Sequence, residues 1–172
     1  MIDSFTKESA AIVTRHLAIA IIASVCGLQS CGPSMPECPY RAEQAAVASA
    51  GCLLNQGSSL LVVAGFNNRI SVPGGGSAKG EAPRCTAHRE TWEETGLEVT
   101  VGKLEQVFDT GFHLYRCQLA TTEATIDPPM RLEVRRAWFL PLPQFSEFEW
   151  RYPYQQALMD EWMRKQNPEP EI

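Results

Sequence analysis

Three glutamates near the middle of the chain have a spacing that suits metal chemistry. Glu90, Glu93 and Glu94 stand at positions i, i+3 and i+4, so on a helix they share one face and their carboxylates converge. Crowding of like charges costs helix stability, and the cost is offset when Mg²⁺ or Mn²⁺ lies between the oxygens. The spacing therefore predicts a divalent metal site. A solvated acidic helix face is the alternative that these three residues alone leave open.

Two neighbouring features add to this site. Glu81 comes just before the predicted helix, where a loop carboxylate can fold back toward the same cluster. The run Gly74-Gly75-Gly76 supplies flexible backbone with exposed N–H groups, which suits close approach to a phosphate. The residue types together indicate a phosphate-containing ligand beside a metal ion.

The whole pattern resembles the Nudix box of the Nudix hydrolases, GX5EX7REUXEEXGU with U aliphatic. In this chain it begins at Gly75, passes through Glu81 and ends in RETWEETGL at residues 89–97. One position departs, because Thr91 stands where the family has an aliphatic residue. Since Thr has nearly the shape of Val, we expect its hydroxyl to bond back to the previous helical turn. The resemblance extends over roughly residues 48–165.

The resemblance implies both a fold and an activity. The fold is of the α/β class, a Nudix-type α/β/α sandwich with a mixed β-sheet. The activity is hydrolysis of a diphosphate bond in a nucleoside diphosphate-linked or other diphosphate-X substrate, with Mg²⁺ or Mn²⁺ as cofactor. The alternative is a non-catalytic, membrane-tethered Nudix-fold module that binds its ligand without turnover. We favour the enzyme, because a site that no longer catalyses a reaction has no need of a cluster of mutually repelling carboxylates.

The resemblance also implies the residues of the site. The expected metal ligands are Gly75, Glu81, Glu90, Glu93 and Glu94. The expected catalytic residues are Glu81, Arg89, Glu90, Glu93 and Glu94, among which Arg89 pairs with and orients a carboxylate. The expected substrate-binding residues are Gly74, Gly75, Gly76 and Arg69. Outside the box, Glu133 is a candidate for the general base that accepts a proton from water.

Other polar and aromatic residues carry weaker expectations. His88 occupies a variable position of the box and is expected at the surface. Turn and strand residues are candidates either for a pocket that holds X or for the core. They are Phe66, Phe112, His113 and Tyr115.

The elements that must position these residues can be read from periodicity and turn signals. Strands are predicted at residues 51–54, 59–64, 69–72, 99–108, 112–119 and 136–140, and the run at 73–76 is expected to break regular structure. Helices are predicted at 81–95, with Pro83 in the first turn and Gly96 just past the end, and at 154–165. The Ala-rich segment 41–50 is a candidate for a further short helix. Strands around one central helix, with a second helix at the end, favour an α/β sandwich.

Length and composition agree with one folded domain. The chain has 172 residues, of which 44% are hydrophobic and 20% charged, which separates it from disordered and polytopic membrane proteins. The formal net charge is −5 and there is no long basic run. Nucleic acid is therefore excluded as the expected partner, and a small-molecule diphosphate is favoured.

The N-terminus predicts the compartment. Residues 17–28 form an uncharged apolar run that follows Arg15 and is short for a bilayer span. The run ends in LQSC at residues 28–31, which resembles the bacterial lipoprotein cleavage motif. That resemblance implies a signal peptide over 1–30, a lipid on Cys31, a tether over 31–47, the hydrolase domain over 48–166 and a disordered tail over 167–172. The domain is then expected on the periplasmic side of the cell envelope, held to a membrane by its lipid. An uncleaved anchor, a secretion signal and a cytoplasmic helix are the alternatives.

Four cysteines would remain in the processed chain beyond the acceptor. They are Cys38, Cys52, Cys85 and Cys117, and no pair has the C-x2-C spacing of a zinc site. In an oxidising compartment an even number favours two disulfides. We predict the pairs Cys38–Cys52 and Cys85–Cys117, the alternative being buried small apolar residues.

Overall fold

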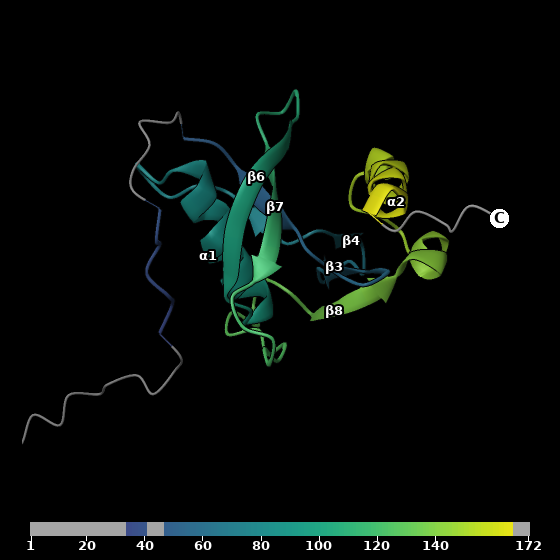
Figure 1. Ribbon diagram of the computed structural model, residues 1–172, viewed down its shortest axis with the longest axis horizontal. Coiled ribbons are helices and arrows are strands. Elements are labelled where there is room, and N and C mark those ends of the chain that lie inside the picture. Colours follow the sequence, from purple (N-terminus) through teal and green to yellow (C-terminus); the bar gives the residue numbers. More distant parts are fainter. Residues whose placement is uncertain (1–33, 41–46, 167–172) are drawn as a thin grey trace, which may run out of the picture. The chain divides into compact units, whose positions relative to one another are not determined.

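The computed structural model describes residues 34–40 and 47–166. The predicted signal peptide, Cys31, most of the candidate helix at 41–50 and the predicted tail at 167–172 lie outside the described residues. Two β-sheets and two α-helices make up the fold (Figure 1). None of the helices in the described part of the chain has the length and apolar character needed to cross a membrane.

The first sheet holds the strands nearest the glycine run. Its order is β5 (Gly74–Gly75), β1 (Ala50–Leu53), β7 (His113–Leu119) and β6 (Val99–Val107). β1 runs parallel to β7, and the other neighbours are antiparallel, so the sheet is mixed. The expectation that the glycine run breaks regular structure is wrong for two of its residues. Gly74 and Gly75 pair with Gly51 and Ala50, because backbones without side chains can approach closely there.

The second sheet is built around β3 (Ser59–Ala64), the continuous apolar run SLLVVA. β8 (Arg136–Pro141) pairs with it along its whole length, and β2 (Asn55–Gln56) and β4 (Ile70–Ser71) pair with its two ends. Asn68, in the turn before β4, has a φ of 61°, a conformation that Asn tolerates. The short 3₁₀ helix η1 (Leu142–Glu147) after β8 was not predicted.

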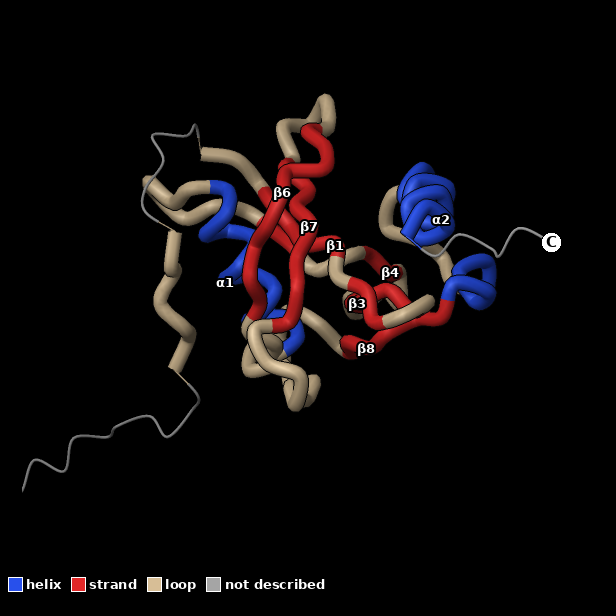
Figure 2. Tube along the Cα trace, in the orientation of Figure 1, coloured by secondary structure: helices blue, strands red, loops and turns tan. Residues whose placement is uncertain are grey.

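Two helices cover the strands. α1 (Pro83–Thr95) packs mainly on β1, β5 and β6, and α2 (Pro153–Gln166) follows η1 at the other end of the sandwich (Figures 1 and 2). Successive strand residues point to opposite faces. Accordingly, Cys52 packs in the same cluster as Ala87 of α1, whereas Leu53 packs in a second cluster with Met159 of α2. The predicted α/β/α sandwich with a mixed sheet is confirmed.

Local signals set the ends of α1. Pro83 is its first residue, two positions later than predicted, and Ala82 is the cap. The last helical residue is Thr95, and the cap Gly96 has a left-handed φ of 76° and donates its N–H to the Trp92 carbonyl over 2.7 Å. Thr91 is buried, and its hydroxyl donates to the Ala87 carbonyl over 2.7 Å, as expected for the atypical box position.

The disulfides form, but the predicted pairing is wrong. Cys52 is bonded to Cys117 and Cys38 to Cys85, with Cα atoms 5.5 and 5.4 Å apart. The first bond joins the parallel neighbours β1 and β7, a pairing that cannot be deduced from the sequence around either cysteine. The second attaches the predicted tether to the first turn of α1, where a bond to the first strand was expected.

That segment also covers His88. The Tyr40 ring meets the His88 ring edge to face, with centroids 6.3 Å apart, and His88 is only 2% exposed. The expectation that His88 lies at the surface is therefore wrong. Burial lowers the pKa of His88, and the nearby charge of Glu98 opposes the shift only in part.

Candidate functional site

Arg89 is the centre of a network of acidic groups on α1 and the loop before it. Its Nε and Nη2 atoms donate to the two carboxylate oxygens of Glu81, each over 2.9 Å. Its Nη1 donates to Glu90 over 2.8 Å and to Glu93 over 2.7 Å. Nη2 also donates to the carbonyl of Gly76 over 2.6 Å. One planar guanidinium thus sets the positions of three carboxylates and of the glycine run.

The glycine run contacts the remaining acidic face of the helix. The Gly74 N–H donates to Oε2 of Glu94 over 2.8 Å. The carboxyl group of Glu90 lies so close to Gly75 that a Cβ there would collide with it. β5 and α1 are therefore in contact at the glutamates, and any larger residue at position 75 would displace the Glu90 carboxyl group.

Glu133 approaches the same place from a distant loop. One carboxylate oxygen each from Glu90, Glu93 and Glu133 can be chosen so that all lie within 4.8 Å of one another. Three hard oxygen donors at this separation fit a divalent cation such as Mg²⁺ or Mn²⁺. Glu94 and Glu81 belong to the same network through Gly74 and Arg89, so the structure brings all the predicted box carboxylates together.

Burial and charge shift the acidities of these groups in different directions. Burial raises the pKa of Glu94 to about 8, and the charges of Glu90 and Glu133 add to the effect while the Gly74 N–H opposes it. Burial also raises the pKa of Glu90, against the lowering effect of Arg89. For Glu81, burial is outweighed by hydrogen bonds from Arg89 and the Ala78 N–H, and its pKa is lowered. Such crowding of buried carboxyl groups is typical of functional sites.

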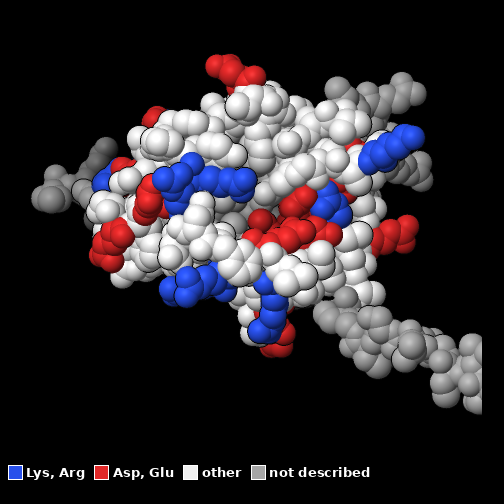
Figure 3. Space-filling view, turned by 180° about the vertical axis from the view of Figure 1, so that it is seen from behind, with Lys and Arg blue, Asp and Glu red and all other residues white. Residues whose placement is uncertain are grey.

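Two adjoining pockets lie beside this network. The first, of about 360 Å³, is lined by Arg69, Glu94, Glu133 and Arg151, with Phe66 at its edge. The second, of about 270 Å³, is lined by the glycines at 74–76 and by a group of aromatic residues. Ser71 and Arg151 line both pockets. The face in Figure 3 shows acidic side chains gathered around a basic one in a hollow, with further basic side chains on the rim.

Of the residues expected either in the pocket for X or in the core, some line a pocket and one packs in the core. Phe66 and Phe112 line a pocket, whereas Tyr115 is buried in the core cluster on the α1 side. Arg69 lines the first pocket and forms an ion pair with Glu149 over 2.6 Å. Sequence reasoning did not select the pocket residues at the start of α2. The only local signal for them is the aromatic-rich stretch WRYPY at residues 150–154.

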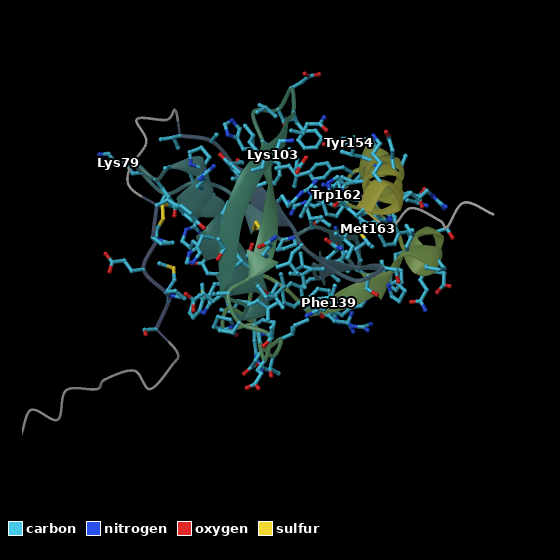
Figure 4. All side chains as sticks on the ribbon, viewed as in Figure 1. Lys79, Lys103, Phe139, Tyr154, Trp162 and Met163 are labelled. Carbon is cyan, nitrogen blue, oxygen red and sulfur yellow. A yellow bond between two sulfur atoms is a disulfide. The ribbon has the colours of Figure 1, made fainter. Side chains whose placement is uncertain are left out.

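The aromatic residues of the second pocket come from two distant segments. Phe108 and Phe112 belong to the hairpin between β6 and β7, and Tyr152 and Tyr154 precede or begin α2. Tyr154, labelled in Figure 4, lies between α2 and that hairpin, with its ring centroid 5.8 Å from that of Phe108. The second pocket therefore exists only when α2 packs against the sheets.

Comparison with known proteins gives one family. The model of the NUDIX domain matches residues 45–166. None of the curated protein sequences is similar enough to the chain to count as a relative.

Solved structures with the same fold are numerous. An ADP-ribose pyrophosphatase from Streptococcus suis superposes with a TM-score of 0.60 at 16% identity, over 73% of this chain and 94% of its own. A UDP-X diphosphatase gives 0.58 at 18% identity, over 74% and 67% of the two chains. A NUDIX hydrolase from Nitrosomonas europaea gives 0.55 at 17% identity, over 67% and 88%. At these identities the likeness concerns the fold.

Proposed function

Because the chain belongs to the Nudix family, we propose that it is a hydrolase that uses Mg²⁺ or Mn²⁺ to cleave a diphosphate bond in a nucleoside diphosphate-linked or other diphosphate-X substrate. The observation that carries the proposal is the convergence of Glu90, Glu93 and Glu133 within 4.8 Å, where Glu133 lines the first pocket and the second pocket adjoins it at the glycine run. Pyrophosphatase and diphosphatase names among proteins of the same fold agree with it.

The residues divide the work by their charge and position. Glu90 and Glu93 would hold the cation, with Glu133 across from them and with Glu81, Glu94 and Gly75 in the surrounding site. When bound, a divalent cation neutralises phosphate charge and lowers the pKa of a coordinated water molecule. Arg69 and Arg151 line the first pocket as cations able to bind phosphate oxygens.

Proton transfer is the remaining requirement. A general base must lie within hydrogen-bond reach of the attacking water and must be unprotonated at working pH. Glu133 is exposed and lies across from Glu90 and Glu93, so we propose it for this role. Glu94 is less suited, since burial keeps its carboxyl group protonated up to a pH of about 8 in the metal-free protein.

A product-release screen tests the proposal. The purified protein would be incubated with nucleotide sugars, dinucleoside polyphosphates, nucleoside triphosphates and lipid diphosphates, with Mg²⁺, with Mn²⁺ or with chelator. We expect metal-dependent release from at least one diphosphate-X class, and loss of it in Glu93→Gln but not in Glu98→Gln, an exposed glutamate outside the network. Binding of these compounds without any turnover would favour the non-catalytic binding module instead.

We also propose that the protein is lipid-anchored through Cys31 on the periplasmic side of the cell envelope. Two disulfides support an oxidising compartment. Because Cys38 is bonded to α1, the proposed anchor at Cys31 lies only seven positions before a residue that is attached to the folded domain. Such a segment spans at most about 25 Å. The expected substrates are therefore diphosphates found in the envelope, either nucleotide-linked metabolites or lipid-linked diphosphates.

A further inference from the structure

The second pocket, beside the glycine run, has walls suited to a flat ring. Tyr152 and Tyr154 stack with ring centroids 5.8 Å apart and an interplanar angle of 27°. The ring centroid of Phe108 lies 5.8 Å from that of Tyr154 and 6.1 Å from that of Phe112, so these rings extend the aromatic wall. Tyr152 and Tyr154 remain 42% and 49% exposed, so their rings have surface available for a ligand. Aromatic surfaces of this kind bind nucleobases by stacking.

The pocket has room for part of a substrate. Its volume of about 270 Å³ is at the small end of the range for small-molecule sites. The space fits one ring system with its sugar better than a complete dinucleotide. The diphosphate of the same ligand would then lie in the adjoining first pocket, because Ser71 and Arg151 line both.

Gln155 places an unsatisfied polar group beside the aromatic wall of this pocket. The residue is only 6% exposed, and it lines the pocket together with the aromatic residues. Its Oε1 atom is buried and accepts no hydrogen bond from any residue in the described part of the chain. A buried acceptor without a hydrogen-bond donor destabilises a folded protein. We therefore expect a bound ligand to supply the donor.

We propose that this pocket binds the nucleobase of the substrate and that Gln155 determines which base is accepted. The inference rests on the proposed function. It favours nucleotide-linked substrates over lipid-linked diphosphates. A base brings an amino group or ring N–H that can donate to Oε1 once the Gln155 side chain turns toward the ligand. The same side-chain amide can then donate to the neighbouring acceptor of the base. A lipid chain brings no donor and would leave Oε1 unsatisfied. A sugar can donate its hydroxyl groups, so binding of ribose 5-phosphate is measured beside that of the nucleotides.

Binding without catalysis is the first measurement. The full chain, in chelator, would be titrated with the four common nucleoside 5′-monophosphates and with ribose 5-phosphate by calorimetry. We expect one nucleotide to bind more tightly than the others and more tightly than ribose 5-phosphate. Gln155→Leu should weaken binding of that nucleotide at least about tenfold and reduce the difference in affinity between bases, because leucine cannot supply the hydrogen bond.

Matched variants separate this role from a structural one. Gln156→Leu makes the same change at the next residue of α2, which does not line the pocket, and should leave binding unchanged. Gln155→Leu should hold or raise the melting temperature of the free protein, because it removes a buried unsatisfied group. Tyr154→Ser, which removes a half-exposed ring, should weaken the binding of all four nucleotides to a similar extent.

The outcomes distinguish this inference from the proposed function. If nucleoside diphosphate substrates are hydrolysed but Gln155→Leu and Gln156→Leu have equal KM and base preference, the role of Gln155 is refuted and the hydrolase stands. Equal affinity for ribose 5-phosphate and the nucleotides would likewise refute it. If nucleotides bind in a Gln155-dependent way and no diphosphate is hydrolysed, the base pocket stands and the hydrolase fails.

Discussion

The carboxyl group of Glu90 lies in the space that a Cβ atom on Gly75 would occupy. β5 is held to β1 by its pairing, and Glu90 is held by Arg89 over 2.8 Å. Neither partner can move far without breaking these contacts. The absence of a side chain at Gly75 thus allows β5 and Glu90 to lie this close together. Because Glu90 belongs to the acidic cluster, Gly75 also affects the geometry of that cluster.

Gly75→Ala should therefore damage activity while leaving the domain folded. The added Cβ pushes the Glu90 carboxyl group away from Glu93 and Glu133, so we expect turnover to fall by about a hundredfold or more, in line with other misplaced catalytic groups. Gly76→Ala should lose much less turnover, because a Cβ at position 76 meets no atom within 4 Å. Steady-state kinetics with circular dichroism of both variants checks this. Equal losses would show that the contact with Glu90 is unimportant.

Glu93→Gln should lower turnover by at least about a hundredfold, because the site loses an anionic metal ligand without opening a cavity. Glu94→Gln should have a similar effect on turnover. For Glu93→Gln the melting temperature without metal should hold or rise slightly, since repulsion with Glu90 and Glu133 is relieved. Full activity in both variants would refute the assignment of the site.

Stability of the metal-free protein should fall as pH rises through the window set by Glu94. Below its ordinary pKa of 4.5, Glu94 is protonated in the folded and unfolded states alike. Between 4.5 and about 8, only the folded state keeps the proton, so the free energy of unfolding decreases with pH and the loss is complete above 8. The total is a few kcal/mol, since one unit of pKa corresponds to about 1.4 kcal/mol.

Glu94→Gln provides the comparison for this pH effect. The variant cannot ionise at this position, so its urea unfolding curves measured in chelator should lose most of the slope between pH 5 and 8. In the variant the two remaining effects oppose each other, because the raised pKa of Glu90 lowers stability as pH rises, whereas the lowered pKa of His88 increases stability as pH rises toward 6.5. Identical slopes in the variant and the parent protein would contradict the assignment.

Peptide mapping without reduction should find Cys38 linked to Cys85 and Cys52 linked to Cys117. The second bond closes a loop with a sequence separation of 65, so replacing both Cys52 and Cys117 by Ala should cost about 4 kcal/mol of unfolding free energy. Urea unfolding gives that value. Four free thiols in protein prepared from periplasm would contradict both bonds.

Labelled fatty acid should be incorporated into the full chain and lost in Cys31→Ser. Acyl chains contribute about 0.8 kcal/mol per buried methylene, so several chains on one residue hold a small domain firmly. The unprocessed variant can still bind a membrane through residues 17–28, and the label is therefore a sharper measurement than fractionation. An unlabelled parent protein would rule out lipidation.

The sequence by itself determined the features that depend on short, regular spacing. The Nudix box placed three glutamates on one helix face, Pro83 and Gly96 marked the ends of that helix to within two residues, and the run at 59–64 was correctly predicted as a strand. These predictions hold because helix and strand periods are local properties of the chain.

Only the tertiary structure decided the features that join distant segments. The parallel pairing of β1 with β7 set the partner of Cys52, and the attachment of Cys38 to α1 buried His88. A long loop brought Glu133 to the acidic cluster, and α2 brought Gln155 to the glycine run. Each of these contacts forms when apolar faces of separate elements pack together, and no spacing along the chain specifies which faces meet.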